Sequence, residues 1–169
     1  MIAIILAHPW HGSFNNAILD AITAQLDTAG RSYEVVDLHK DSFNPVLTES
    51  ELSLYANGEY SDPLVGKYQD ILTRADEVVF IFPIWWGTMP AMLKGWLDKV
   101  MLVNFSHNYT NGWTPLLDIQ KTVVVTTSQS PTEKFASAIQ GDFINNGLAA
   151  VGFQNAQWLN CDNVGFGTD

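Results

Sequence analysis

Residues 80–96 read FIFPIWWGTMPAMLKGW, and this stretch decides the fold. Its apolar run stops at Pro83, passes through Trp85 and Trp86, and resumes at Pro90 as a helical pattern. A continuous apolar run is typical of a strand that is buried on both faces of a parallel sheet. In open α/β sheets ligands bind beyond the carboxyl ends of the strands. The two tryptophans therefore predict a site for a flat ligand.

The rest of the chain alternates strands and helices in the same way. We expect strands at 2–7, 33–38, 77–82, 121–127 and 153–159, and helices at 17–29, 64–74, 90–103 and 132–150. The polar segment 39–62 between them holds at most a short helix at 49–56. Right-handed crossovers then give an α/β, doubly wound three-layer sandwich with a five-stranded parallel sheet in the order 2-1-3-4-5. Only ten residues follow Leu159, so we expect a terminal helix that is short or missing, leaving apolar surface uncovered.

Length and composition bound the function. A chain of 169 residues fits a single domain, 1–169, with a full core. Its 8 basic and 18 acidic residues argue against a nucleic-acid partner, because such binding relies on basic side chains. No apolar run is long enough for membrane insertion. The single Cys161 and the lack of a signal-peptide pattern predict a cytoplasmic location.

The loop after the first strand has the composition of an anion site. Ser13 is expected to cap the following helix, whose free N–H groups and dipole attract a phosphate. Asn15 and His8 add side-chain donors. Neither a P-loop nor a G-x-G-x-x-G motif follows this strand, which disfavours a P-loop hydrolase and a Rossmann NAD domain.

The loops after the third and fourth strands could hold the ring of a flat ligand such as a flavin. Pro83 ends the strand, Pro90 is expected at the first position of the next helix, and a tricyclic ring could lie along the loop between them. The alternative is that the tryptophans seal a core or a dimer contact. Residues 126–130, TTSQS, offer small donors and acceptors for a polar ring edge, although an ordinary solvated loop has the same composition.

Several motifs together carry a resemblance that spans nearly the whole chain. They are AHP at 7–9 with SFN at 13–15, FPIWW at 82–86, MPA at 89–91, LKGW at 93–96 and the pair Thr126-Thr127. The chain resembles the NAD(P)H:quinone oxidoreductase family of flavodoxin-like flavoproteins. The resemblance implies FMN, with FAD as the alternative, NADH or NADPH as electron donor, a quinone-like acceptor and a homodimer. It implies cofactor-binding residues His8, Ser13, Phe14, Asn15, Pro83, Ile84, Trp85, Trp86, Gly87, Thr126, Thr127, Ser128 and Gln129, and substrate contacts Phe105, His107 and Tyr109.

The sequence also departs from the family pattern. The Tyr and His that assist charge relay in mammalian-type quinone reductases fall near Lys134 or Phe135 and at Gln140, and Ser128-Gln129 replaces a glycine pair. The expected function is a flavin-dependent NAD(P)H dehydrogenase (quinone)-type oxidoreductase that works by ping-pong transfer. It needs no side-chain catalytic residue, and no metal site is expected, because His8 and His11 lack ligand spacing. The alternatives are a flavin-binding redox regulatory (ancillary) subunit of a transport system, an azo/nitro-compound or FMN reductase, and an electron-carrier flavodoxin.

Overall fold

The fold is built on a five-stranded parallel sheet. A computed structural model describes residues 1–165. Its sheet strands are β1 (Ile2–Leu6), β2 (Tyr33–Asp37), β3 (Glu77–Pro83), β6 (Lys121–Thr127) and β7 (Gln157–Cys161). They pair in the order β2-β1-β3-β6-β7, all in parallel register. Counted along the sheet strands alone this is 2-1-3-4-5, so the predicted topology is confirmed.

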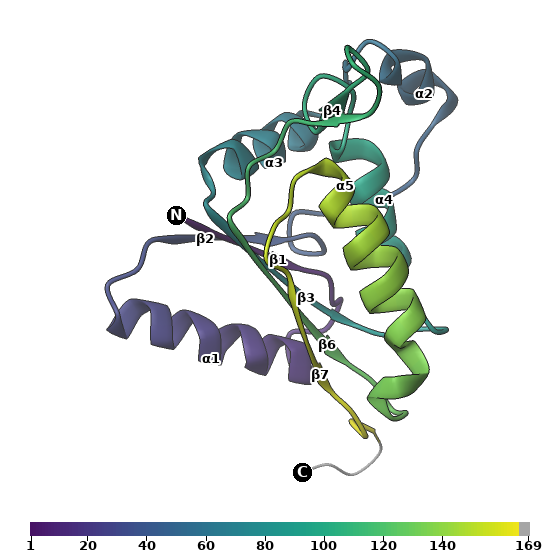
Figure 1. The fold of residues 1–169 in the computed structure, drawn as a ribbon. Helices are drawn as coiled ribbons and strands as arrows, with labels where there is room; N and C mark the ends of the chain where they lie inside the picture. The colour runs from purple at the N-terminus through teal and green to yellow at the C-terminus, as the bar shows by residue number, and fades with distance from the viewer. Residues whose placement is uncertain (166–169) are drawn as a thin grey trace.

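Helices cover both faces of the sheet (Figure 1). Helix α1 (Phe14–Thr28) lies on one side, and α3 (Pro63–Arg74) and α4 (Ala91–Val100) lie on the other. Beside α4 runs a helical segment that begins as a 3₁₀ turn, η1 (Thr132–Phe135), continues with π-type bonding in η2 (Ser137–Leu148), and ends as α5 (Ala149–Val151). The short α2 (Glu49–Tyr55) lies within the polar excursion, where a helical turn was expected.

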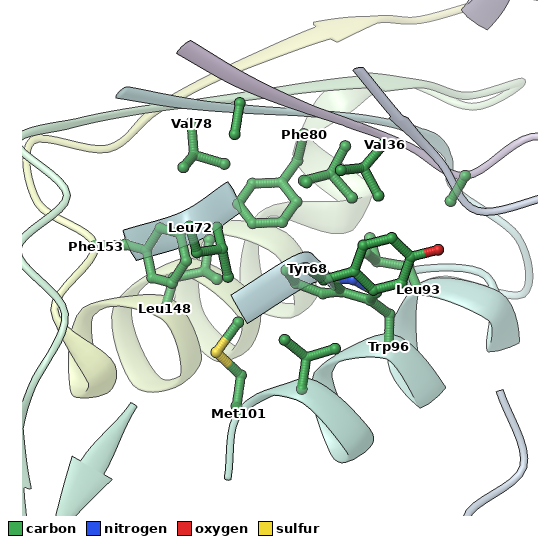
Figure 2. Packing of buried hydrophobic residues seen from close by; sticks show 14 of the residues in the cluster. Val36, Tyr68, Leu72, Val78, Phe80, Leu93, Trp96, Met101, Leu148 and Phe153 are labelled. Carbon is green, nitrogen blue, oxygen red and sulfur yellow. The ribbon is translucent and has the colours of Figure 1, made fainter. Parts of the chain in front are cut away.

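The core follows from side-chain alternation along the strands. Ile5 and Phe80 face α3, α4 and η2, where the larger cluster also holds Tyr68, Trp96 and Phe153 (Figure 2). On the opposite face, Ile2, Ile4, Leu6, Ile81 and Val125 pack against the apolar stripe of α1. That second cluster thins toward β7, where Leu159 is 56% exposed. Residues 162–165 contain no helix, and the rest of the expected terminal segment, 166–169, lies outside the described residues.

Some predicted boundaries were wrong for identifiable reasons. The last strand begins at Gln157, not at Phe153, because Gly152 has φ +106° and Phe153 donates its N–H to Leu148 O, closing the preceding helix. A Cβ at Gly152 would lie 1.9 Å from Leu117 O, so only glycine fits this cap. Segment 105–115 contains an unpredicted antiparallel pair, β4 (His107–Asn108) with β5 (Thr114–Pro115). Within residues 1–165 no helix is both long and apolar enough to cross a membrane.

Candidate functional site

Three loops at the carboxyl ends of β1, β3 and β6 meet around one cavity of about 650 Å³, which we call the rim cavity. This volume lies within the ~300–1,000 Å³ typical of cofactor and ligand sites. Every predicted cofactor-binding residue except Thr126 lines it. Its lining comprises His8, Trp10, Ser13, Phe14, Asn15, Pro83, Ile84, Trp85, Trp86, Gly87, Thr127, Ser128, Gln129, Ser130, Phe135, Val164 and Gly165.

The first loop is held at the amino end of α1 by its own hydrogen bonds. Ser13 is the N-cap, as predicted, and its Oγ accepts from Asn16 N over 3.2 Å and from Asn16 Nδ2 over 3.0 Å. The carbonyl of Trp10 accepts from Ser13 N over 3.1 Å and from Asn16 Nδ2 over 2.9 Å. The loop is therefore fixed before any ligand binds, and the first turn of α1 keeps N–H groups for an anion.

Asn15 connects this loop with the third one. Its Oδ1 accepts a hydrogen bond from the Thr127 hydroxyl over 2.9 Å. Its Nδ2 is buried without a partner, although Asn15 lines the rim cavity. A buried amide donor without a partner costs about 1–3 kcal/mol. A ligand oxygen in the cavity would remove that cost.

His8 lies between the first and second loops. Its Nδ1 accepts a hydrogen bond from Trp10 N over 3.1 Å, and its ring meets Trp85 edge-on with centroids 5.8 Å apart. Desolvation lowers the pKa of His8, the backbone hydrogen bond with Trp10 raises it, and nearby His39 lowers it. Nδ1 also lies 3.2 Å from the carbonyl oxygen of Trp10, so this atom can accept from Trp10 N or donate to Trp10 O, depending on the tautomer. Among the described residues that line the rim cavity there is no Lys or Arg.

The second loop is a tight turn that displays tryptophan. Trp85 and Thr88 exchange two backbone hydrogen bonds of 2.9 and 3.2 Å, and the central residues Trp86 and Gly87 have φ +53° and +86°. Positive φ at both central positions defines a type I′ turn, in which glycine or asparagine is usual and tryptophan is not. The turn leaves Trp86 104% exposed and Trp85 44% exposed. Pro90 is the N-cap of α4, whereas it was expected at the first helical position, so the helix begins one residue later, at Ala91.

The third loop uses its two threonines differently. Thr126 is fully buried outside the rim cavity, where its hydroxyl donates to Asn160 Oδ1 over 2.7 Å and accepts from Trp158 Nε1 over 2.8 Å. Thr127 lines the cavity. Ser128 N donates to Cys161 O over 3.0 Å, which attaches the loop to β7.

Sequence reasoning did not select five lining residues, namely Trp10, Ser130, Phe135, Val164 and Gly165. Trp10 and Ser130 belong to the predicted loops, so taking every residue of each loop would have found them. Val164 reaches the cavity because its N–H donates to Ser128 O over 2.9 Å. No local pattern signals that contact. Of the relay positions, Phe135 lines the cavity, while Gln140 Nε2 donates to Asn145 Oδ1 over 3.0 Å.

The predicted substrate residues do not line the rim cavity. His107 and Tyr109 belong to the β4–β5 segment, which Figure 1 shows at the end of the molecule opposite the carboxyl end of β7. His107 is 1% exposed and stacks on Trp113 with centroids 4.0 Å apart, whereas Tyr109 is 61% exposed. Phe105 packs, partly buried, against the core. His107 and Trp113 line a separate cavity of about 450 Å³.

An apolar groove connects the two ends along α4 and η2. A third cavity, of about 850 Å³, begins at Trp85 and Trp86 and is lined further by Thr88, Met89, Pro90, Ala91, Lys94, Leu97, Ala138, Asp142, Phe143 and Gly147. The cavity lined by His107 and Trp113, which we call the hairpin cavity, shares Leu97, Phe143 and Gly147 with this third cavity. We call this continuous surface the α4–η2 groove.

Known proteins are similar to this chain in sequence and in fold. The chain is 28% identical over 158 residues to NAD(P)H dehydrogenase [quinone] 1 of Rattus norvegicus, covering 82% of this chain and 57% of the relative. It is 34% identical over 110 residues to an uncharacterized NAD(P)H oxidoreductase of Haemophilus influenzae, covering 64% and 54%. This chain therefore spans little more than half the length of these curated relatives.

A solved structure agrees over a larger share. The NAD(P)H:quinone oxidoreductase from Methanothermobacter marburgensis superposes with a TM-score of 0.85 at 28% identity, covering 99% of this chain and 89% of that one. The resemblance predicted from the loop motifs is thus confirmed. A family model described as flavodoxin-like fold matches residues 1–161. Because that match spans nearly the whole chain and the sheet has the corresponding strand order, this chain belongs to the family of proteins with a flavodoxin-like fold.

Proposed function

We propose that this protein is a flavin-dependent NAD(P)H oxidoreductase that passes two electrons to a quinone or a similar flat acceptor. One observation carries the proposal: the three rim loops form a single cavity that combines exposed indoles, a helix amino end and the unpartnered Nδ2 of Asn15. A ligand with a ring, a hydroxylated chain and a phosphate would use all three. The names of the relatives support the same reaction class.

FMN is the proposed cofactor, with FAD as the alternative. The first turn of α1, Ser13 and Asn15 would hold the phosphate and the ribityl chain, and the His8 ring would add a polar contact. Residues 83–87 would lie along the ring, and Thr127 to Gln129 would border its polar edge. NADH or NADPH would donate the electrons. Thr126, which is bonded to Trp158 and Asn160, would support the loop without touching the cofactor.

The bound flavin would supply the chemistry of two-electron transfer. The residues of this chain orient the reactants and exclude water. Trp85 and Trp86 form an apolar wall beside the ring site, so a flat donor or acceptor can stack there in turn. No Lys or Arg lines the cavity among the described residues, and His8 is neutral at pH 7, so charge in the site is controlled by backbone N–H groups.

A homodimer would complete the acceptor site. The hairpin with His107 and Tyr109 and the rim cavity lie at opposite ends of one subunit, joined by the apolar α4–η2 groove. A second copy related by a two-fold axis across this groove would bring its hairpin to the Trp86 turn of the first. It would also cover Trp86 and the groove, whose exposure is otherwise unfavourable. We further propose that residues 1–169 form one flavin-binding domain in the cytoplasm, in keeping with the free thiol of Cys161.

Flavin titration and turnover test the proposal. Purified protein is titrated with FMN and with FAD while the flavin absorption bands are followed, and oxidation of NADH and NADPH by menadione is then measured against an equal concentration of flavin alone. We expect shifted bands and turnover well above the flavin background. Bands that do not move for either flavin would contradict the cofactor assignment. Shifted bands without turnover would instead favour the regulatory subunit.

Light scattering after gel filtration tests the dimer. We expect twice the mass of the chain, and a monomer after Leu97→Glu, which places a charge in the middle of the groove. Lys94→Glu is the matched control, because Lys94 lies at the groove edge with its side chain 60% exposed. A wild-type monomer that retains full quinone turnover would exclude the shared acceptor site.

A further inference from the structure

Trp10 carries an exposed indole on a loop whose backbone is hydrogen-bonded. Its side chain is 67% exposed and lines the rim cavity. Its backbone is fixed on both sides, since its N–H donates to His8 Nδ1 over 3.1 Å and its carbonyl accepts from Ser13 N over 3.1 Å. The same carbonyl of Trp10 accepts another hydrogen bond from Asn16 Nδ2 over 2.9 Å. A planar side chain on such a backbone offers a ring surface at little further entropic cost.

Gly12 fixes where the indole lies. A Cβ built at Gly12 would stand 2.5 Å from Cζ2 and 2.7 Å from Cε2 of Trp10. The indole therefore rests against the backbone at Gly12, in a space that a Cβ at this position would occupy. One side of the ring system contacts the loop, and the 67% exposure of the side chain leaves the remainder accessible at the cavity edge.

The position of Trp10 relative to the proposed phosphate site indicates which part of a ligand could stack on its indole. Trp10 and Ser13 are joined by a backbone bond at the amino end of α1, where the phosphate of a flavin is proposed to lie. The second loop, with Trp85 and Trp86, already provides aromatic walls for the tricyclic ring. Trp10 therefore lies next to the phosphate end of the site, where FMN ends and a dinucleotide continues.

The lack of positively charged side chains among the described residues of the rim cavity gives a reason for a second aromatic contact with the ligand, in addition to Trp85 and Trp86. Among the described lining residues no Lys or Arg is available to hold phosphate. Extra affinity must then come from contacts that need no positive charge, and stacking of a base on an aromatic side chain is one of them.

We propose that Trp10 is a stacking platform for the adenine of a ligand that extends beyond the phosphate site through a pyrophosphate. The shared chemistry is an adenosine diphosphate moiety, which FAD and NAD(P)H both carry. This inference rests on the proposed flavin function, and it makes Trp10 the residue that distinguishes dinucleotide from mononucleotide ligands. Gly12 is the positioning residue that admits the indole.

The test compares ligands with and without the adenylate. Isothermal calorimetry measures the Kd of FMN and of FAD for wild type, Trp10→Ala, Trp10→Phe and Trp113→Phe. Trp113 is a matched control, because it is 50% exposed but lines the hairpin cavity. Trp10→Ala should lower the affinity for FAD relative to that for FMN about tenfold, which corresponds to about 1.4 kcal/mol. Trp10→Phe should lose only part of this ratio, and Trp113→Phe should leave it unchanged.

A second arm identifies the source of the adenylate. The KM values of NADH and of reduced nicotinamide mononucleotide are measured with FMN-loaded wild type and Trp10→Ala. If the FAD to FMN affinity ratio is the same in wild type and Trp10→Ala but Trp10→Ala raises the KM of NADH alone, the adenylate belongs to the electron donor. If Trp10→Ala changes neither quantity while flavin still binds, the platform is overturned. If neither flavin binds to wild type, the proposed function itself fails, which is a different result.

Discussion

The hydroxyl of Thr127 donates a hydrogen bond of 2.9 Å to Oδ1 of Asn15, across 112 positions of sequence. This bond orients the Asn15 amide so that Nδ2 is the group without a partner. Because Thr127 occupies the acceptor Oδ1, the donor Nδ2 of the same amide stays available for a ligand. The β1 and β6 loops are joined through this pair before any cofactor binds.

The first prediction removes this bond. Thr127→Val should leave a buried Oδ1 without a donor, lower the unfolding free energy by about 1–3 kcal/mol, and weaken flavin binding several-fold because the amide can rotate. Thr126→Val is the matched control, since Thr126 bonds to Asn160 and Trp158 outside the cavity. It should lose stability without losing flavin affinity. Urea unfolding and a flavin titration measure the two effects, and equal flavin affinity in wild type and Thr127→Val would argue against the orienting role.

A second prediction concerns the strained turn. Trp86 has φ +53° and is 104% exposed, so its side chain contributes backbone strain and no packing within the subunit. Left-handed geometry costs a residue with a Cβ about 1–2 kcal/mol. Trp86→Gly should therefore raise the unfolding free energy of the monomer slightly, by up to about 1 kcal/mol after the glycine entropy term, while it weakens acceptor stacking.

The opposite change in the same turn serves as its control. Gly87 has φ +86°, and a Cβ there would meet nothing within 4 Å, so Gly87→Ala should destabilise the fold by about 1 kcal/mol through the backbone alone. Both variants are compared by urea unfolding at a protein concentration below the dissociation constant of the proposed dimer. A Trp86→Gly protein that is less stable than wild type under these conditions would mean that the indole packs within its own subunit.

Much of this organisation could be read from the sequence, because it is local. Continuous apolar runs gave the strand positions, Ser13 was recognised as a cap, and Gly30, with φ +62°, follows the end of α1. The bonds Arg31 N to Leu26 O and Gly30 N to Asp27 O close that helix end. Such signals lie within a few residues of the feature they predict.

Other features depend on contacts between distant residues. The role of Thr126 could not be separated from that of Thr127, because adjacent strand residues point to opposite faces and only the bonds to Trp158 and Asn160 show that Thr126 points away from the rim cavity. The last strand was predicted too early because Phe153, an apolar residue, closes a helix instead. The contact of Val164 with Ser128 has no signature in either segment.

A third prediction follows from the buried ion cluster between α4, α2 and α3. Lys99 has a side chain that is 3% exposed, and its Nζ lies 2.7 Å from Glu51 Oε1 and 3.3 Å from Asp62 Oδ2. It attaches α4 to α2 and to the N-cap of α3. Lys99→Met should cost about 3–5 kcal/mol, because it leaves two carboxylates without their cation. Lys94→Met, which removes an exposed i,i+4 pair with Asp98, should cost less than about 0.5 kcal/mol by the same urea measurement.

The last prediction is the pH dependence carried by His107. Burial lowers its pKa below the usual 6.5. Its Nδ1 lies 2.9 Å from Ser106 Oγ and its Nε2 is buried without a partner. Tyr109 and Trp113 pack on the ring, and Asp98 lines the same cavity. As pH falls below about 6.5 the unfolded chain binds a proton before the folded one does, so the contribution of His107 to stability is present above that pH and lost below it.

Comparison with a side chain that does not titrate isolates this effect. Relative to His107→Gln, wild type should lose unfolding free energy between pH 7.5 and pH 5.5, measured by urea unfolding at each pH. Taking the difference between the two proteins cancels the other groups that titrate in this range. A constant difference between wild type and His107→Gln over this range would show that His107 reaches solvent when it takes up its proton, for instance by release of its stack on Trp113.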